Sequence, residues 1–253
     1  METKQKRTKV LVSLLALAGL LVFSTFTMAG DLEPPGAPGS TMKTLDEVEP
    51  RIPISQSDIP LTINESGSYY FTEDINSAGN AITVEVNDVT IDLAGFTLAG
   101  PNSGTNYGIY MSERSNVEIR NGTVRDFRHG IIENSNSGQG HRVIDVRALS
   151  NGATGIYLKS KNNLVKDCTV SGNGTSAAGN TVYGIYAGYG STVTGNTAYD
   201  NGDSATSNAY GIWLAGYNLV DQNTAYGNGT GSGLATNMTL GVTRCVYVNN
   251  VAP

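Results

Sequence analysis

The sequence predicts an all-β solenoid in which each coil has three short strands and each strand pairs with its equivalent in the next coil. A Gly-Ile pair recurs along the chain at intervals of 22, 25, 29 and 27 residues. Periods of about 20 to 50 residues are typical of solenoids, and a variable period indicates loops inserted into a fixed framework. The glycines of these pairs are Gly108, Gly130, Gly155, Gly184 and Gly211, after a degenerate copy at Asn80-Ala81-Ile82.

Composition and the pattern inside one copy favour the same fold class. The chain has 31 Gly but 5 Phe and 1 Trp, so a thin stacked core is favoured over a bulky one. The copy that starts at Gly184 contains three strand-like segments, Ile185–Ala187, Thr192–Thr194 and Thr197–Tyr199, with no helical segment between them. Three strands in a copy predict a triangular coil, and stacked copies would form parallel ladders with strands about 4.8 Å apart.

The N-terminal segment is typical of a secretory signal peptide over residues 1–29. Four basic residues precede an apolar run from Val10 to Phe23, and small or hydroxylated residues follow where a signal peptidase would cut. The alternative is an uncleaved membrane anchor, because the stretch from Val10 to Met28 is just long enough to span a bilayer. We expect cleavage, since the core of the run is short, and therefore a secreted or periplasmic protein with no membrane contact after signal cleavage.

After the signal segment the chain is acidic and begins with a proline-rich stretch. Cleavage removes four basic residues and one acidic residue, which leaves 12 Lys and Arg against 21 Asp and Glu and a net charge of −9. Such a chain is a poor partner for nucleic acid, whose phosphates require basic surface. Residues 30–57 are expected to form a proline-rich linker with a candidate cap helix over Thr41–Val48, and residues 58–253 the solenoid domain.

Asparagines at two turns of the repeat predict hydrogen-bonded ladders along the solenoid axis. Asparagine tolerates left-handed backbone, and stacked amides hydrogen-bond from one coil to the next. Counting from each Ile gives a first column of Asn121, Val146, Cys168, Asn196, Asn223 and Cys245. A second column contains Asn151, Asn173, Asn201 and Asn228. Three coils, roughly 14 Å, would separate the two cysteines, which excludes a disulfide because that bond joins Cα atoms within about 7 Å.

These features resemble the right-handed parallel β-helix proteins with pectate-lyase-type repeats. The resemblance rests on the Gly-Ile-Tyr and Gly-Ile-Trp openings, on "GNTAYDNG" and "QNTAYGNG" at the second turn, and on "SYYFTEDI", and it covers roughly residues 60–250. It implies a right-handed parallel β-helix of about six to seven coils with an N-terminal cap. In this family the first strand of each coil and its flanking loops line the usual glycan cleft. The fold hosts lyases, hydrolases, epimerases and non-enzymes, so the resemblance leaves the activity open.

The residue after each buried Ile should point outward, because side chains alternate along a strand. This outward column contains Thr83, Tyr110, Ile132, Tyr157, Tyr186 and Trp213. The candidate carbohydrate-binding residues are its aromatic members, which could stack on sugar rings laid along the axis, and a lysine of the next outward column: Tyr110, Tyr157, Tyr186, Trp213 and Lys159. The alternative is that the aromatics stabilise an exposed sheet through cross-strand contacts of about 0.2–1 kcal/mol each.

No catalytic residue, metal site or cofactor is assigned from the sequence. Nine of the twelve mature basic residues and both histidines, His129 and His141, lie between Arg114 and Lys166. Such groups could neutralise a uronate carboxylate and remove its C5 proton in a lyase. The alternative is that they are solvated side chains paired with neighbouring carboxylates. Paired carboxylates of hydrolase type and clustered acidic calcium ligands are missing, and two lone histidines are weak support for a transition metal.

Two parts of the chain depart from the repeat. Glu133 falls on an inward position, and we expect a local slip that turns Ile132 inward rather than a buried acid. The last copy, Leu234 to Val251, has no evident cap, and an uncapped solenoid end favours self-association through the C-terminal coil. The inward candidates of that copy are Leu240, Val242, Val246 and Val248.

The leading functional hypothesis is a secreted β-helix protein that binds an extracellular or cell-envelope polysaccharide along its aromatic face. Processing of that polysaccharide by lyase or epimerase chemistry is the enzymatic version of this hypothesis. The competing class is a non-enzymatic structural or adhesive cell-surface protein, which would bind no glycan on this face.

Overall fold

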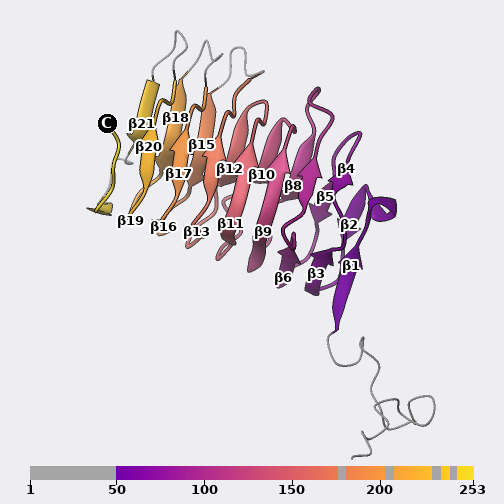
Figure 1. The fold of residues 1–253 in the computed structure, drawn as a ribbon. Coiled ribbons are helices and arrows are strands. Elements are labelled where there is room, and N and C mark those ends of the chain that lie inside the picture. The colour runs from indigo at the N-terminus through magenta and orange to yellow at the C-terminus, as the bar shows by residue number, and fades with distance from the viewer. Residues whose placement is uncertain (1–49, 176–180, 203–207, 230–234, 240–243) are drawn as a thin grey trace, which may run out of the picture. The chain divides into compact units, whose positions relative to one another are not determined.

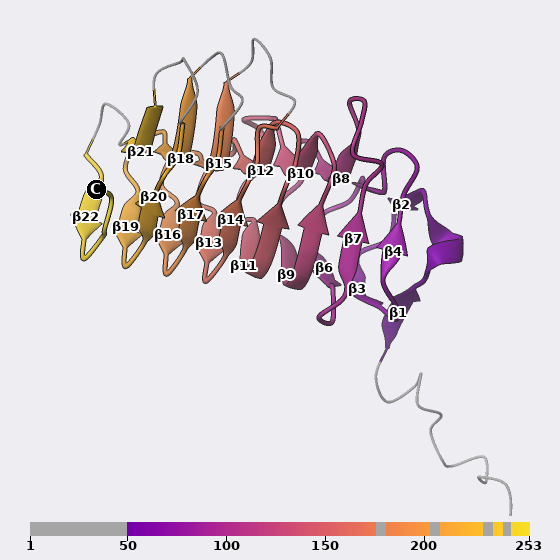
Figure 2. The ribbon, with the colours of Figure 1, turned by 45° about the horizontal axis from the view of Figure 1, so that its top comes forward.

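The computed structural model describes residues 50–175, 181–202, 208–229, 235–239 and 244–253. The predicted signal peptide, the linker up to residue 49 with its candidate cap helix at Thr41–Val48, and the positions of Leu240 and Val242 lie outside the described residues. Residues 50–253 form one compact unit. Figures 1 and 2 show it as a stack of coils that succeed one another from β1 to β22.

The strands belong to two sheets in which every pairing is parallel. The eight-stranded sheet covers one side of the coil and runs in the order β2 (Leu61–Ile63), β5 (Ile82–Val84), β8 (Tyr107–Met111), β10 (His129–Glu133), β12 (Thr154–Leu158), β15 (Val182–Ala187), β18 (Ala209–Leu214), β21 (Ala235–Thr239). The main path of the fourteen-stranded sheet is β1 (Arg51–Ile54), β3 (Gly67–Phe71), β6 (Val89–Asp92), β9 (Val117–Arg125), β11 (Arg142–Leu149), β13 (Leu164–Lys166), β16 (Thr192–Thr194), β19 (Leu219–Asp221), β22 (Val246–Val248). Its other strands are β4 (Ile75–Asn76), β7 (Thr97–Ala99), β14 (Thr169–Ser171), β17 (Thr197–Tyr199) and β20 (Thr224–Tyr226).

The predicted fold class is confirmed: the unit is an all-β, right-handed parallel β-helix of about six turns. The fourteen-stranded sheet bends within each coil. In β9 the bend lies at Asn121, which has a φ of +57°, so β9 pairs with β6 before the bend and with β7 after it. The left-handed backbone is accessible to Asn at little cost, which is why one strand can serve two sides of the triangle.

The core consists of inward files of aliphatic side chains, one from each side of the coil. The Ile after each repeat Gly is completely buried, and these residues stack in register through β5, β8, β10, β12, β15 and β18: Ile82, Ile109, Ile131, Ile156, Ile185 and Ile212. From the Ile onward the side chains alternate, so the residue after each Ile takes an outward position, whereas the Gly before it is buried as well. The Gly-Ile signature is therefore a burial signal.

From Gly130 onward, the glycine of each signature is required by the asparagine that closes the same coil. A Cβ built on Gly184 would lie 2.9 Å from Nδ2 of Asn201 and 2.5 Å from the carbonyl oxygen of Gly211. The equivalent Cβ on Gly155 would lie 3.0 Å from Nδ2 of Asn173. Because Cβ atoms do not approach backbone and amide atoms this closely, the Gly-Ile pair and the Asn column belong to one packing unit.

The predicted second asparagine ladder is confirmed and extends one coil further. Each Nδ2 donates to the Oδ1 of the next amide at 2.8–3.1 Å, through Asn151, Asn173, Asn201, Asn228 and Asn237. Each Oδ1 also accepts from the backbone N–H of the preceding Asn, as Asn201 does from Asn173 at 3.2 Å. Buried amides are tolerated here because the coil repeat supplies partners to both ends of each side chain.

The predicted first column is wrong at both ends. Strand register pairs Val146 with Gly122 rather than with Asn121. At the other end Asn223 donates to Oδ1 of Asn250 at 2.9 Å, so Asn250 and not Cys245 continues the column. Turn lengths between the first and second strands differ among coils, so a count from Ile slips by several residues. Cys168 and Cys245 do not form a disulfide with each other, and burial raises the pKa of the Cys168 thiol to about 12.

The predicted slip at Glu133 is also wrong, because the strand keeps its register and buries the acid. Glu133 pairs with Met111 and Leu158 on the inward file and is completely buried. Its two carboxylate oxygens accept backbone N–H bonds from Ser135 and Ser160, both at 2.7 Å. Burial raises the pKa of this carboxyl despite these bonds. The two N–H donors offset part of the desolvation that made a buried acid unexpected.

At the first end of the solenoid the sheet starts earlier than the sequence suggests, and at the last end the inward side chain differs. The sheet begins with β1 at Arg51, before the expected domain start at residue 58, and Pro53 fits there because β1 is an edge strand. In the last strand Tyr247 pairs with the buried Val220 and therefore occupies the inward position, whereas Val246 and Val248 lie on the outward positions. All three side chains of β22 are at least 40% exposed.

Candidate functional site

The outward face of the eight-stranded sheet brings the four candidate aromatics into one file. Strand register places Tyr110 beside Ile132, Ile132 beside Tyr157, Tyr157 beside Tyr186, and Tyr186 beside Trp213. Each of these strands contributes the residue that follows the buried Ile, so the file follows directly from the alternation of side chains. Their role in carbohydrate binding stays a prediction.

A second outward file, which the sequence analysis did not identify, runs beside the first. It is formed by the residue before each repeat Gly and contains Tyr107, His129, Thr154, Tyr183 and Tyr210. These residues lie three positions before the first file and two before the buried Ile, so strict alternation from the Ile would point them inward. They face outward because the repeat Gly and the Ile after it are both buried, which breaks the alternation at the Gly. Rings of the two files touch, since the Tyr183 ring meets the Tyr186 ring edge-on with centroids 5.2 Å apart.

The aromatic rings of the C-terminal coils stack on one another. Ring centroids are 4.3 Å apart for Tyr157 and Tyr186, and 4.5 Å for Tyr186 and Trp213, with interplanar angles of 29° and 14°. Burial raises the pKa of the Tyr186 hydroxyl, and the neighbouring tyrosines add to this effect. Since Tyr186, the inner ring of this stack, is covered on both faces, it offers a ligand its edge and hydroxyl. A sugar stacked flat on each ring, as expected from the sequence, does not fit the middle of this stack.

The file is interrupted at Ile132, and this gap is a pocket of about 310 Å³. Ile132 forms its floor between the tyrosines of the flanking coils. The walls come from β10, β12 and β15 and from residues next to these strands: Arg128, His129, Asn134, Ala153, Thr154, Tyr157, Thr181 and Tyr183. A second hollow of about 370 Å³ lies on the other side of Tyr110 and includes Glu85 and Arg114.

His129 is a neutral imidazole at the wall of the pocket. Its ring stacks on Tyr107 at a centroid distance of 5.6 Å and an interplanar angle of 25°. Nδ1 is buried, and no described residue forms a hydrogen bond with it. Burial, with a contribution from the Arg128 guanidinium, lowers the pKa of His129 to about 4. At neutral pH this side chain is therefore uncharged and has the acceptor character of a neutral imidazole.

Arg128 differs from the other arginines around it. Arg120, Arg125 and Arg142 each form an ion pair with a carboxylate, and Arg114 and Arg147 donate hydrogen bonds to neutral oxygens. The Arg128 side chain forms neither an ion pair nor a hydrogen bond with a described residue. The pocket that Arg128 lines contains no acidic residue. An unpaired guanidinium in such a pocket is suited to bind a carboxylate with two parallel hydrogen bonds.

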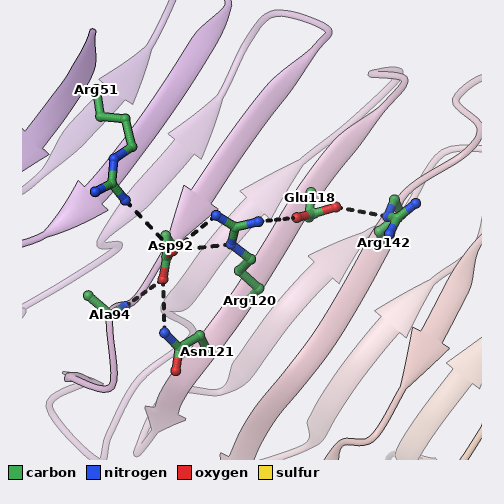
Figure 3. A network of polar contacts seen from close by, with 7 residues as sticks. All are labelled: Arg51, Asp92, Ala94, Glu118, Arg120, Asn121 and Arg142. Carbon is green, nitrogen blue, oxygen red and sulfur yellow. Dashed lines mark hydrogen bonds and ion pairs between the residues drawn. The ribbon is translucent and has the colours of Figure 1, made fainter. Parts of the chain in front are cut away.

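Most other basic residues of this region are used by the fold, on another side of the coil (Figure 3). Arg120 binds Asp92 at 3.1 Å and Glu118 at 3.0 Å, and Arg142 binds the same Glu118 at 2.8 Å. Arg51 reaches Asp92 at 4.0 Å. These pairs cross the outer face of β1, β6, β9 and β11, where charges of both signs alternate. For these residues the expected pairing with neighbouring carboxylates is correct.

Two further predictions concern Lys159 and metal binding. Lys159 follows β12 one coil after Asn134, and it does not line the pocket that holds Tyr157. His141 is buried at a corner of the coil, where its Nδ1 accepts from the backbone N–H of Val117 at 3.4 Å, so it serves the fold. Within the described ranges no three His, Cys, Asp or Glu side chains are grouped as metal ligands. No helix formed by the described residues is long and apolar enough to cross a membrane.

Comparison with protein families agrees with this architecture. The family model described as "Right handed beta helix region" matches residues 73–218 and, in a second overlapping match, residues 107–252. The chain belongs to the right-handed β-helix family. No curated protein sequence matches this β-helix protein.

Two solved structures resemble this β-helix at low sequence identity. The Dettilon tailspike protein gp208 has a TM-score of 0.51 and 14% identity, over 79% of this chain and 38% of the tailspike chain. The A-module of the mannuronan C-5 epimerase AlgE4 from Azotobacter vinelandii has a TM-score of 0.53 and 14% identity, over 79% of this chain and 66% of the module. This β-helix therefore spans less than two thirds of either relative, and the likeness shows a shared fold.

Proposed function

We propose that this β-helix protein binds an acidic polysaccharide along the outer face of its eight-stranded sheet. A sugar carboxylate binds Arg128 in the pocket at Ile132, and the polymer continues across the edges of the aromatic stack. The single observation that carries the proposal is the unpaired Arg128 guanidinium in a pocket without acidic residues. The name of the structurally similar epimerase, which refers to mannuronan, supports this class of ligand.

The geometry favours an extended ligand over a compact one. Two hollows lie on either side of Tyr110 on the same face, and the stack from Tyr157 to Trp213 continues that face. Equivalent positions of adjacent coils are about 4.8 Å apart, so a polymer along the axis meets a similar surface at each coil. Tyrosine hydroxyls and ring edges supply hydrogen bonds and apolar contact to sugars.

The test is calorimetric titration with mannuronan and galacturonan hexasaccharides, using neutral hexasaccharides as comparison. Arg128→Ala should weaken binding of the acidic ligand by about tenfold or more, because a hydrogen bond to a charged group contributes about 1.5–3 kcal/mol. Arg128→Lys should recover part of the loss. Arg125→Ala is the matched control, since Arg125 pairs with Asp126 away from the pocket. Equal affinity in wild type and Arg128→Ala would refute the proposal.

A second candidate function is β-elimination or C5 epimerisation of a uronate unit at the same pocket. It is favoured by the shared position of Arg128, neutral His129 and Tyr157, which supply a carboxylate-neutralising group and two proton-transfer groups. Ultraviolet absorbance of unsaturated products on mannuronan or galacturonan tests the lyase. Deuterium incorporation at C5 from heavy water tests the epimerase. Both signals should vanish in His129→Gln. If wild type gives neither signal, the second candidate function is wrong and the protein binds the polysaccharide without processing it.

Export and the competing structural role have separate tests. The proposal of a secreted or periplasmic protein is tested by mass spectrometry of the exported chain, whose first residue should be close to Gly30. Self-association through the C-terminal coil is tested by light scattering of wild type and Val246→Lys, since β22 exposes apolar side chains. An adhesive role without a ligand would be favoured if no glycan binds while the wild type forms oligomers that Val246→Lys lacks.

A further inference from the structure

Two tyrosines at the corner after the eight-stranded sheet are the most exposed aromatic side chains among the described residues. Tyr189 follows β15 and is 54% exposed, and Tyr217 follows β18 and is 59% exposed. They stand on adjacent coils, with ring centroids 6.5 Å apart and planes tilted by 41°. At this distance and tilt neither ring covers the other, in contrast to the stack at Tyr186. Their flat faces are therefore available to a ligand.

The backbone at Tyr217 adds a second observation. Tyr217 has a φ of +57°, at a corner position held in the preceding coils by Gly190 and Asn162, with φ of +67° and +59°. The backbone N–H of Asn162 donates to the Tyr189 carbonyl, and the N–H of Gly190 donates to the Gly216 carbonyl. In a parallel ladder these bonds align Asn162 with Gly190, and Gly190 with Tyr217. Glycine and asparagine adopt this conformation readily, whereas a bulky aromatic does so at a cost in free energy. Among the described residues, Tyr217 is the only aromatic residue with a positive φ.

The fold gains little from Tyr217 in return. Its ring contacts the Tyr189 ring and no other aromatic ring of the described residues, and no described partner forms a hydrogen bond with its hydroxyl. A side chain that is strained, exposed and weakly packed is best explained by a contact outside the chain.

The surroundings of this pair define the chemistry of that contact. After Asp167 the sequence contains four charged residues, Asp200, Asp203, Asp221 and Arg244. The residues of the eight-stranded sheet next to the pair are uncharged, with Tyr186 and Trp213 at the centre of the face and Gly188 and Ala215 at its margin. Exposed aromatic faces without charge are suited to the apolar C–H faces of a neutral sugar. This is a different chemistry from that of the Arg128 pocket.

We infer that Tyr189 and Tyr217 form a neutral-sugar subsite on the same binding face, two to three coils beyond the acidic pocket. This inference rests on the proposed function, because it adds a second specificity to the same polysaccharide track. The interval along the axis is roughly 10–14 Å at about 4.8 Å a coil. The aromatic stack through Tyr157 and Tyr186 connects the two subsites. The ligand that satisfies both is a polysaccharide that carries acidic and neutral units.

The experiment uses two classes of probe on the full-length protein. The neutral probes are cellohexaose, mannohexaose and galactohexaose, and the acidic probe is mannuronan hexasaccharide. For the neutral hexasaccharide that wild type binds, Tyr217→Gly and Tyr189→Ala should each lower the affinity by about tenfold. The reason is that loss of an aromatic platform removes about 1–2 kcal/mol of contact. Mannuronan affinity should change less than twofold in these variants and fall in Arg128→Ala. Tyr226→Ala is the matched control, because Tyr226 is 43% exposed on a different side of the coil.

Stability separates a lost contact from a lost fold. Tyr217→Gly should unfold at a temperature equal to or above that of wild type, since glycine relieves the positive φ. A lower melting temperature would show that the ring serves the fold and would overturn the inference. Saturable binding of none of the neutral probes, or equal binding in Tyr217→Gly, would also overturn it. Failure of the proposed function gives a different result, in which wild type and Arg128→Ala bind mannuronan hexasaccharide with equal affinity.

Discussion

The indole ring of Trp213 lies 4.5 Å from the ring of Tyr186, and the two planes are within 14° of parallel. Tyr157 continues this stack on the other face of Tyr186 at 4.3 Å. Parallel strands about 4.8 Å apart place equivalent side chains at van der Waals contact, so an aromatic at the same position of each coil stacks on the next. The inner ring, that of Tyr186, thus contributes both faces to the fold and its edge to the surface.

Tyr186→Leu should therefore destabilise the protein by about 1 kcal/mol or more beyond the loss of buried area, because it removes ring contacts with Tyr157, Trp213 and Tyr183. Urea unfolding followed by the fluorescence of Trp213, the one tryptophan in the chain, measures this change at the stack itself. Tyr189→Leu is the control, since the Tyr189 ring is more than half exposed and tilted away from its neighbour. Equal losses in both variants would contradict the stacking argument.

Ile132→Tyr should close the pocket while improving the aromatic file. A tyrosine there would stack between Tyr110 and Tyr157, in the register that the strands already have. We expect the affinity for acidic hexasaccharide to fall at least about tenfold with no loss of stability. Calorimetry and thermal unfolding of the same preparation give both quantities. Retained affinity would show that the ligand does not enter the gap at Ile132.

The sequence predicts the fold and the aromatic file because both depend on short-range rules. Each Gly-Ile pair fixes the direction of the next two or three side chains, so Tyr186 and Trp213 could be placed on one face from alternation alone. The same count fails across a turn, since turn lengths differ among coils. For this reason the count from Ile assigns Asn121 and Cys245 to a column whose positions in the structure are Gly122 and Asn250.

The pocket and the buried acid depend on partners that are distant in sequence. Glu133 is stabilised in part by the backbone N–H of Ser160, 27 residues away, and alternation alone cannot reveal this donor. The pocket exists because Ile132 is smaller than the aromatic residues beside it in the file. The pocket's positive charge is left uncompensated because no acidic residue lines it beside Arg128. His129 and Tyr183 could not be found by alternation from the buried Ile, because the Gly between them and the Ile is buried too and the alternation breaks there.

Asn201→Ala tests the asparagine ladder. Asn201 accepts from the backbone and side chain of Asn173, and its Nδ2 donates to Asn228 at 2.8 Å and to the Val170 carbonyl at 3.0 Å. Alanine would leave these buried groups without partners, which should cost about 3 kcal/mol or more of unfolding free energy. Chemical denaturation measures it, with the exposed Asn64→Ala as control. A loss below about 1 kcal/mol would show that the ladder relaxes.

Binding of an acidic glycan should be nearly independent of pH between 5.5 and 8. Burial lowers the pKa of His129 to about 4, so its imidazole stays neutral over this range, and the guanidinium of Arg128 stays charged. Calorimetric affinities at constant ionic strength should therefore agree within about twofold. Affinity that rises as the pH falls through about 6.5 would indicate that His129 gains a proton in the complex.

His141→Asn should flatten the acid side of the stability profile. Burial lowers the pKa of His141 from 6.5 to about 4. The unfolded chain therefore binds a proton at a higher pH than the folded one, and the stability that the neutral imidazole provides above pH 6.5 is lost as the pH falls toward 4. The shift corresponds to roughly 3 kcal/mol.

Asparagine suits this corner, because in the next coil the Oδ1 of Asn163 accepts the backbone N–H of His141 at 3.0 Å, in the way that Nδ1 of His141 accepts that of Val117. His141→Asn thus keeps an acceptor for Val117 and removes the titration. Urea unfolding at pH 8, 6 and 4 should show a smaller loss in the variant than in wild type. His129 titrates in the same direction and Glu133 in the opposite one, and both effects cancel in the difference between the two proteins. Parallel profiles for wild type and variant would mean that His141 does not cause the acid loss.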